Sequence, residues 1–162
     1  MTRTKPEIIC CGHAAYDLNF IMDEYPVEDE KYRIDNLIQT GGGPAANAAT
    51  LLSRWGVNAA YAGLIGDDVY GRLILEELRS DGVDTALTEI NGHKKTPVSA
   101  VIVNETNGSR TLLNRRDAED QPAVTDEVTA RLAAIAEHRP PKVLHFDGHA
   151  LDLSLKMIEM FP

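Results

Sequence analysis

A glycine-rich turn has the clearest chemical use in this chain. Three consecutive glycines, Gly41 to Gly43, run into Pro44 and an alanine-rich stretch that contains Asn47. Glycine lets main-chain amides approach a ligand, and proline suits the first helical turn, whose amides favour anionic or oxygen-rich groups. The Asn47 side chain, about one turn further on, can both donate to and accept from a polyhydroxy ligand. The pattern therefore predicts a ligand-binding connection between a strand and a helix.

The spacing around this turn excludes two phosphate-binding loops. No Gly-Lys-Ser/Thr follows the glycines, which excludes a P-loop, and the glycines are contiguous rather than spaced as in a dinucleotide fold. A tight turn without any ligand remains the alternative, because glycine and proline mark turns in every fold. The glycine turn alone does not distinguish a ligand-binding connection from a tight turn without a ligand, so other residues have to do so.

Composition indicates a soluble globular domain. The chain has 162 residues, of which 43% are hydrophobic and 25% charged, enough to bury a core. A net charge of -9 argues against binding to nucleic acid or to an anionic membrane. No apolar run approaches the ~20 residues of a membrane span, and the N-terminus has no apolar signal-peptide region. We therefore expect a cytoplasmic protein that binds neither nucleic acid nor membranes.

The two cysteines, Cys10 and Cys11, are neighbours in an apolar segment. Successive side chains of a strand point to opposite faces, so these thiols are expected to be buried packing residues and to form neither a disulfide nor a metal site. The five histidines show no ligand spacing, and no metal site is expected.

Alternating elements surround the glycine turn. Apolar runs and helical periodicity predict an α/β fold in which helices flank a parallel sheet. Ligands bind such sheets at the carboxyl ends of the strands. The predicted strands lie near 7–11, 58–65 and 143–147, and the predicted helices at 44–55, 69–80, 125–138 and 151–160.

A second group of segments predicts a small β lid. Segments 18–22 and 32–38 are amphipathic and are joined by a polar stretch, so they are expected to pair as antiparallel strands. Strands at 98–103 and 110–113 flank an Asn-Gly pair, which is typical of a hairpin. The lid is therefore assigned to approximately 18–38 and 98–114.

Four groups of residues, taken in order, resemble the ribokinase or PfkB family of carbohydrate kinases. They are Gly12 with Asp17, the turn 42–49, Trp55-Gly56, and the run 63–71 that contains Gly66-Asp67-Asp68. The resemblance implies a ribokinase-like fold, and phosphoryl transfer from ATP, with Mg²⁺, to a sugar hydroxyl. It also implies a homodimer through the lid, whose apolar side chains such as Phe20 and Ile102 are more numerous than a fully solvated lid needs.

The resemblance also assigns acceptor-binding residues. In such kinases the N-terminal glycine pair contacts the sugar rather than ATP, which assigns Gly42, Gly43 and Asn47 to sugar binding. Asp17 matches a carboxylate that accepts hydrogen bonds from sugar hydroxyls, and a site of this kind penalises ligands that lack them. A turn or capping role is the alternative for Asp17.

Three further candidates are Asn114, Arg115 and Asp147. Asn114 and Arg115 lie where family members return from the lid to the pocket, and an arginine fork suits a carboxylate or phosphate on the acceptor. A solvated surface pair is the alternative for this run. Asp147 ends the last predicted strand, near the position where the family presents a polar sugar contact. Ala15 and Pro44 differ from the asparagine and lysine of ribose-specific members, so ribose is not implied.

The resemblance covers only the front half of such a kinase. The family's C-terminal Gly-Ala-Gly-Asp run, which supplies the catalytic base and much of the ATP site, has no match here. We therefore expect residues 1–162 to be the N-terminal part of one kinase domain, inactive alone, with its base unassigned and no tightly bound cofactor. A nucleoside kinase of the same fold and a noncatalytic sugar-binding half-domain are the alternatives.

Overall fold

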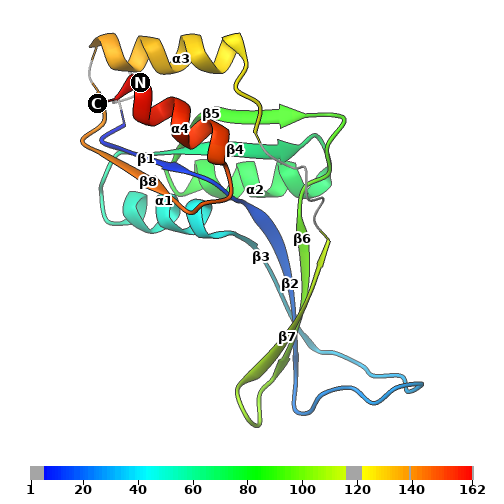
Figure 1. The fold of residues 1–162 in the computed structure, drawn as a ribbon. Helices are drawn as coiled ribbons and strands as arrows, with labels where there is room; N and C mark the ends of the chain where they lie inside the picture. Colours follow the sequence, from blue (N-terminus) through cyan, green and yellow to red (C-terminus); the bar gives the residue numbers. More distant parts are fainter. Residues whose placement is uncertain (1–5, 116–121, 139, 162) are drawn as a thin grey trace.

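The computed structural model describes residues 6–115, 122–138 and 140–161 and is built around a parallel sheet (Figure 1). Its strands have the order β5-β4-β1-β8, and each neighbouring pair is parallel. The central strands are buried on both faces, as is usual where helices cover a parallel sheet. The strands span β1 Ile8–Cys11, β4 Ala59–Gly66, β5 Asp84–Asn91 and β8 Val143–Phe146.

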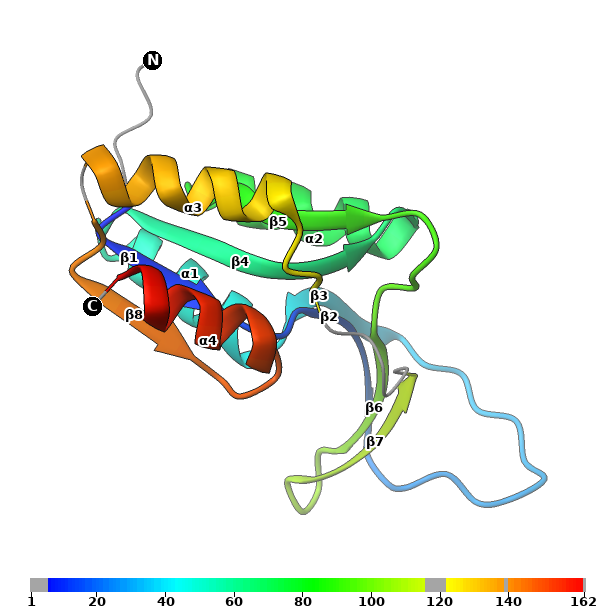
Figure 2. The same ribbon diagram turned by 45° about the horizontal axis from the view of Figure 1, so that its top comes forward.

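Helices of the described residues cover both faces of this sheet (Figure 2). Helices α1 (Pro44–Arg54) and α2 (Val69–Ser80) pack on one face, and α3 (Asp126–His138) and α4 (Leu151–Met160) pack on the other. Each face has its own apolar cluster. The α/β architecture with helices on both faces was predicted from the alternation of apolar runs and helical periodicity, and it is confirmed.

The paired cysteines show the alternation of side chains along β1. Cys10 belongs to the cluster under α1 and α2, whereas Cys11 belongs to the cluster under α3 and α4. Both thiols are free and fully buried, and burial raises the pKa of each to about 11. They are packing residues, as expected, and the thiolate form needed for reactivity is suppressed at neutral pH.

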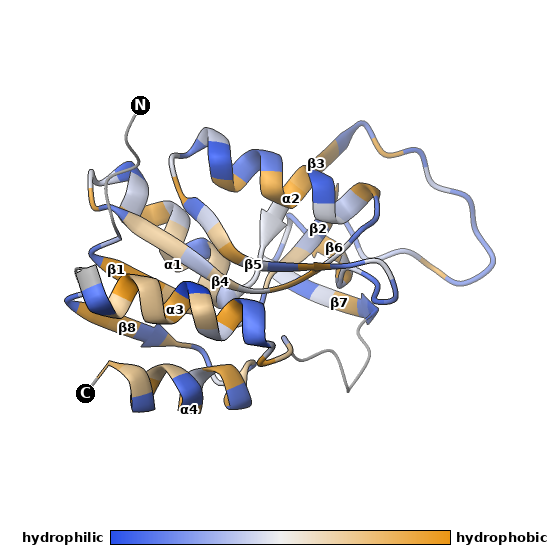
Figure 3. Cartoon of the chain, turned by 90° about the horizontal axis from the view of Figure 1, so that it is seen from above, coloured by the Kyte–Doolittle hydropathy of each residue, from blue (hydrophilic) through white to orange (hydrophobic). Residues whose placement is uncertain are grey.

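The lid is a second, separate sheet that extends away from the helical layers (Figure 1). Its order is β3-β2-β6-β7. The pairs β2/β3 and β6/β7 are antiparallel, and the central pair β2/β6 is parallel. The connection between β2 and β3 is mostly hydrophilic (Figure 3). The strands span β2 Ala15–Met22, β3 Asn36–Gly42, β6 Val98–Asn104 and β7 Ser109–Arg115.

Two predictions about the strands need correction. The strand predicted at 32–38 is instead β3, at Asn36–Gly42, because Gly41 and Gly42 pair with Tyr16 and Ala15 of β2. Glycine is disfavoured in strands, so the sequence alone placed these residues in the turn. Strand β5 was missed, because polar residues interrupt its apolar positions along one edge of the sheet.

Asp68 fixes the base of the lid to helix α2. Its carboxylate caps α2 by accepting the Gly71 amide at 2.9 Å, and it also accepts the Thr96 amide at 3.0 Å, just before β6. Arg115 donates to the Thr96 carbonyl at 2.8 Å. Burial alone would raise the pKa of Asp68, but the two amides, the Thr96 hydroxyl and the nearby Arg115 charge outweigh burial and hold this pKa below its ordinary value.

We predict that Asp68→Ala lowers the free energy of unfolding at pH 7 by about 2 kcal/mol, because it removes a helix cap and leaves the Thr96 amide without its acceptor. A carboxyl with a lowered native pKa stabilises above its unfolded pKa of about 4 and loses this contribution as pH falls through the native value. The difference between the proteins should therefore shrink below about pH 4. Urea unfolding across pH measures both effects.

Asp67→Ala is the matched control for this substitution. The Asp67 carboxylate contacts Arg72 at 3.2 Å, but both side chains are more than half exposed, so the change should cost less than about 1 kcal/mol. Equal losses in the two variants would contradict the role assigned to Asp68.

Candidate functional site

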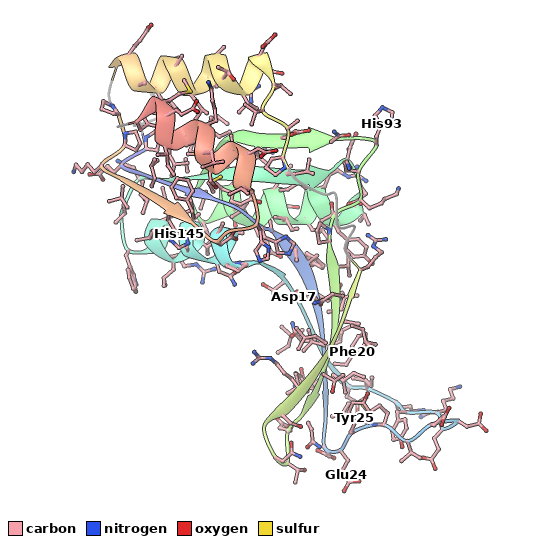
Figure 4. The ribbon with its side chains drawn as sticks, viewed as in Figure 1. Asp17, Phe20, Glu24, Tyr25, His93 and His145 are labelled. Carbon is pink, nitrogen blue, oxygen red and sulfur yellow. The ribbon has the colours of Figure 1, made fainter. Side chains whose placement is uncertain are left out.

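Asp17 lies where the lid leaves the helical layers, with Phe20 farther out along the lid (Figure 4). Asp17 is paired with Thr40 on one side and with Ser99 on the other, and Ser99 is paired with Asn114. Residues in register across neighbouring strands project to the same face of a sheet. The lid therefore presents a row of four polar side chains, Thr40, Asp17, Ser99 and Asn114, which we call the polar row.

The glycine turn packs against this row and against the β1–β2 connection. A side chain at Gly42 would overlap the Asp17 carboxylate. A side chain at Gly43 would overlap the His13 carbonyl and the Ala14 backbone, and Gly43 has a φ of 97° that other residues rarely adopt. Close backbone approach therefore requires both glycines, and it brings Asp17, Gly42 and Gly43 together.

Asp147 joins the same region from the end of β8. Its Oδ2 accepts the amides of His13 at 2.8 Å and Ala45 at 3.1 Å, and its Oδ1 accepts the His149 amide at 2.9 Å. Ala45 is in the first turn of α1, where the helix dipole favours a negative charge. A carboxylate has about four acceptor positions, so three bonds to the backbone leave about one for a ligand hydroxyl.

These contacts correct the expectation that the first turn of α1 offers its amides to a ligand. The Ala45 amide is taken by Asp147, the Ala46 amide points to the His13 carbonyl at 3.4 Å, and the Asn47 amide bonds to Gly43 at 2.9 Å. The group that the helix terminus attracts is a carboxylate of the chain itself. A ligand here would be bound by side chains and by the glycines themselves.

Asn47 is exposed on α1 and faces a cavity beside the glycine turn. The cavity measures about 160 Å³ and lies between β3, α1 and α2, with Gly42 and Glu77 among its lining residues. Gly42 thus borders both this cavity and Asp17. Gly42 is the link between the two predicted sugar-binding side chains.

The side chains of Asn114 and Arg115 project from opposite faces of the lid sheet, because successive residues of β7 alternate between its two faces. Asn114 shares the polar row with Asp17. Arg115 projects from the opposite face, where its guanidinium donates to the Thr96 carbonyl. Arg115 was also predicted to bind the substrate, and the structure places its side chain at the lid base, on the face opposite Asn114. Its neighbours Arg116 and Asp117 lie outside the described residues.

The positions of His13 and Glu77 beside the candidate residues were not predicted from the sequence. The rings of His13 and His149 lie 5.3 Å apart between centroids, next to Asp147. Their positions just after the carboxyl ends of β1 and β8 were the available signal. Glu77 accepts the Gly41 amide at 2.6 Å, a contact for which no local pattern exists.

The described part of the chain contains neither a cluster of metal-binding side chains nor a membrane-spanning helix. No group of three or more His, Cys, Asp or Glu side chains in it could hold a metal ion. None of its helices is long and apolar enough to cross a bilayer. These residues alone therefore do not fit a metal site.

The model of the pfkB family carbohydrate kinases matches residues 5–158, almost the whole chain. The chain belongs to this family. The match includes the glycine turn, Asp17 and Asp147, so the family resemblance inferred from the motifs is confirmed.

Relatives and solved structures agree with this assignment. The chain is 33% identical over 109 residues to ketohexokinase of Mus musculus and 30% identical over 131 residues to an ATP-dependent ribose-1-phosphate kinase of Halopiger xanaduensis. These matches cover 67% and 81% of the chain but only 37% and 44% of the relatives.

A structure of Arabidopsis thaliana ribokinase complexed with ribose and ATP superimposes with a TM-score of 0.78 at 18% identity. It covers 98% of this chain, which in turn covers 50% of the plant protein. The ribokinase-like fold is therefore confirmed, and the chain spans about half the length of the proteins it matches.

We predict that Gly43→Ala destabilises the chain by about 2 to 4 kcal/mol, because a methyl group there meets the His13 and Ala14 backbone and the residue has a positive φ. Gly92→Ala is the control, since Gly92 has open space around its Cα and no positive φ, and it should change stability by less than about 1 kcal/mol. Urea denaturation of both variants makes the comparison. Similar losses would show that close packing does not select the glycine at position 43.

Proposed function

We propose that this chain is the acceptor-binding half and the lid of an ATP-dependent sugar kinase, which transfers a phosphoryl group to a carbohydrate hydroxyl. The observation that carries the proposal is the contact of Asp17 with Gly42 at the junction of lid and sheet, in a chain of the pfkB family. The names of the relatives support a sugar acceptor, because they include a ketohexokinase and a ribose-1-phosphate kinase.

In this proposal, the described residues of the chain recognise the sugar acceptor. Asp17 would accept hydrogen bonds from two neighbouring sugar hydroxyls, and Asn114 of the polar row and Asn47 of α1 would add amide contacts. Asp147 retains about one acceptor position for a further hydroxyl. The lid sheet above them would exclude water and hold the acceptor hydroxyl in place.

ATP and Mg²⁺ belong to the complete enzyme in this proposal. ATP supplies the phosphoryl group, and structures of ribokinases with ATP or ADP support its use by this fold. We assign neither nucleotide nor catalytic base to the described residues and expect this chain alone to be inactive. Strand β8 forms an edge of the sheet, and α4 exposes Leu151, Leu155 and Ile158, which fits further packing by the rest of the domain.

We also propose a cytoplasmic protein whose partners are small molecules and a second copy of itself. The free, buried thiols of Cys10 and Cys11 support a reducing compartment, since small domains of oxidising compartments favour disulfides. The net charge of -9 supports the expectation that neither nucleic acid nor an anionic membrane surface is a partner.

In the complete kinase, Asp17→Ala should lower kcat/KM for the sugar about 10- to 100-fold, because a hydrogen bond to a charged acceptor contributes about 1.5 to 3 kcal/mol. Asn47→Ala should cost less, since its bonds are neutral. Steady-state kinetics with both substrates varied should show an unchanged KM for ATP. Asp126→Ala, on the exposed start of α3, is the control and should behave as the unaltered enzyme.

The acceptor has to be found first, by an ATP-consumption screen over sugars, sugar phosphates and nucleosides. If only nucleosides were phosphorylated, the proposed sugar kinase would be wrong and the nucleoside kinase would be the function instead. A raised KM for ATP with unaltered sugar kinetics in Asp17→Ala would refute the placement of the sugar.

We further propose that the complete enzyme is a homodimer joined through its lids. One face of the lid sheet is apolar and borders an open hollow of about 270 Å³. Leu113 on this face is 60% exposed, and β3 and β7 are open edges of the sheet. Exposed apolar faces and open strand edges favour association, and a two-fold axis would cover both lids alike. The hollow is lined by Phe20, Met22, Pro26, Tyr32, Ile34, Ala100, Ile102 and Leu113.

Leu113→Glu should convert the dimer to a monomer, because a charge would be buried at the centre of the lid contact. Leu51→Glu, on the exposed side of α1, should leave the dimer intact. Light scattering at about 10 to 50 μM, above the Kd expected of a stable dimer, measures both masses. An unaltered protein that is already monomeric there would refute the proposal.

A further inference from the structure

We propose that Glu77 is a positioning residue for the acceptor site, acting through the glycine turn. Its carboxylate holds Gly41, and Gly41 in turn places Gly42 against Asp17. Glu77 itself lies on α2 and lines the cavity that Asn47 also faces. The inference rests on the proposed sugar-kinase function and assigns to it a residue that makes no predicted contact with the sugar.

The contact between Glu77 and β3 is short and charged. Glu77 Oε2 accepts the Gly41 amide at 2.6 Å and lies 3.5 Å from the Thr40 hydroxyl. Strand β3 is an edge of the lid sheet, so its outward amides lack a strand partner, and the carboxylate provides one for Gly41. Hydrogen bonds to an ionised acceptor are about twice as strong as neutral ones. Any side chain at Gly41 would press on the same oxygen.

Helix α2 is held firmly enough to serve as a reference for the lid. Ile74 and Leu78 are buried in the apolar cluster under α1 and α2. Arg54, at the end of α1, binds Asp81, just after α2, through two bonds of 2.9 and 3.0 Å. At its other end, α2 is capped by Asp68, which also binds the Thr96 amide before β6. Glu77 of α2 therefore binds the end of β3, and Asp68 at its N-terminus binds the segment before β6. The two carboxylates hold both sides of the lid base.

Strand β2 pairs with the glycine turn on one side, and on the outer side Glu77 restrains it. Gly41 and Gly42 have no side chains to anchor them, and the cavity of about 160 Å³ beside them leaves room for a shift. Gly42 lies against the Asp17 carboxylate, so a shift of the turn moves the backbone relative to Asp17, the residue proposed to bind the sugar. Displacements of about 1 Å in a binding site can cost on the order of 100-fold in rate.

The test compares Glu77→Ala, Glu77→Gln and Glu76→Ala in the complete kinase, with the acceptor found by the screen. Glu77→Ala should raise the acceptor KM about tenfold while the KM for ATP stays within about twofold, because a charge-assisted bond is lost far from the nucleotide. Glu77→Gln keeps an oxygen acceptor and should restore most of the acceptor KM. Glu76→Ala, exposed on the same helix, should change neither value.

Hydrogen exchange gives a second measurement that needs no activity. In the complete protein, peptides that contain Gly41 should exchange faster in Glu77→Ala than in Glu76→Ala, and Glu77→Gln should lie between them. A merely structural role would lower the active fraction, and therefore kcat, without changing the acceptor KM.

Unaltered acceptor KM in Glu77→Ala, or unaltered exchange at Gly41, would overturn the role of Glu77. A complete, folded protein that phosphorylates no acceptor would instead overturn the proposed function. The exchange result still decides whether Glu77 restrains the turn, so the two failures are distinguishable.

Discussion

The carboxylate of Asp147 binds the backbone of three segments at once, and the arrangement of the site depends on it. It accepts amides from the β1–β2 connection, from the first turn of α1 and from its own loop. Without it, the amides of His13 and Ala45 would lack their acceptor in a partly buried position, which is costly. Because the turn that begins α1 is fixed in this way, Gly43 can lie directly on the His13 carbonyl.

Side-chain carboxylates also bind backbone amides where the lid joins the helical layers. Asp68 accepts the Thr96 amide before β6, and Glu77 accepts the Gly41 amide at the end of β3. In each case a side-chain carboxylate satisfies an amide at a point where the chain passes from one sheet to the other. Part of the acidic excess of this chain is therefore structural, whereas the Asp17 carboxylate beside Gly42 is assigned to the sugar in the proposed function.

The candidate site belongs to a chain that matches the pfkB family over residues 5–158. The chain supplies the lid, the glycine turn and the parallel sheet β5-β4-β1-β8, and it spans about half of its relatives. In the proposed function this chain supplies acceptor recognition, and none of its described residues is assigned to phosphoryl transfer. The residues proposed to bind the sugar all precede residue 148. In the described part of the chain, no group of three or more His, Cys, Asp or Glu side chains could hold a metal ion.

The sequence alone determined those features that depend on local physics. Apolar runs and helical periodicity were sufficient for β1, β4, β8 and the four helices of the described residues, because burial of a face imposes a period on neighbouring residues. Turn chemistry was sufficient for the β6–β7 hairpin. The glycine turn and Asp17 were recognisable because several short motifs occur in a fixed order, and the family match confirms that order.

Only the tertiary structure decided the partners of these residues. The bonds from Asp147 reach amides 102 and 134 residues away, and the bond from Glu77 to Gly41 spans 36 residues, so no local pattern encodes them. Strand β3 extends through Gly41 and Gly42 because β2 pairs with them, against the low strand preference of glycine. The face from which Arg115 projects could not be predicted, because a one-residue step along a strand changes the face, and the register of β7 is set by pairing with β6 across the sheet.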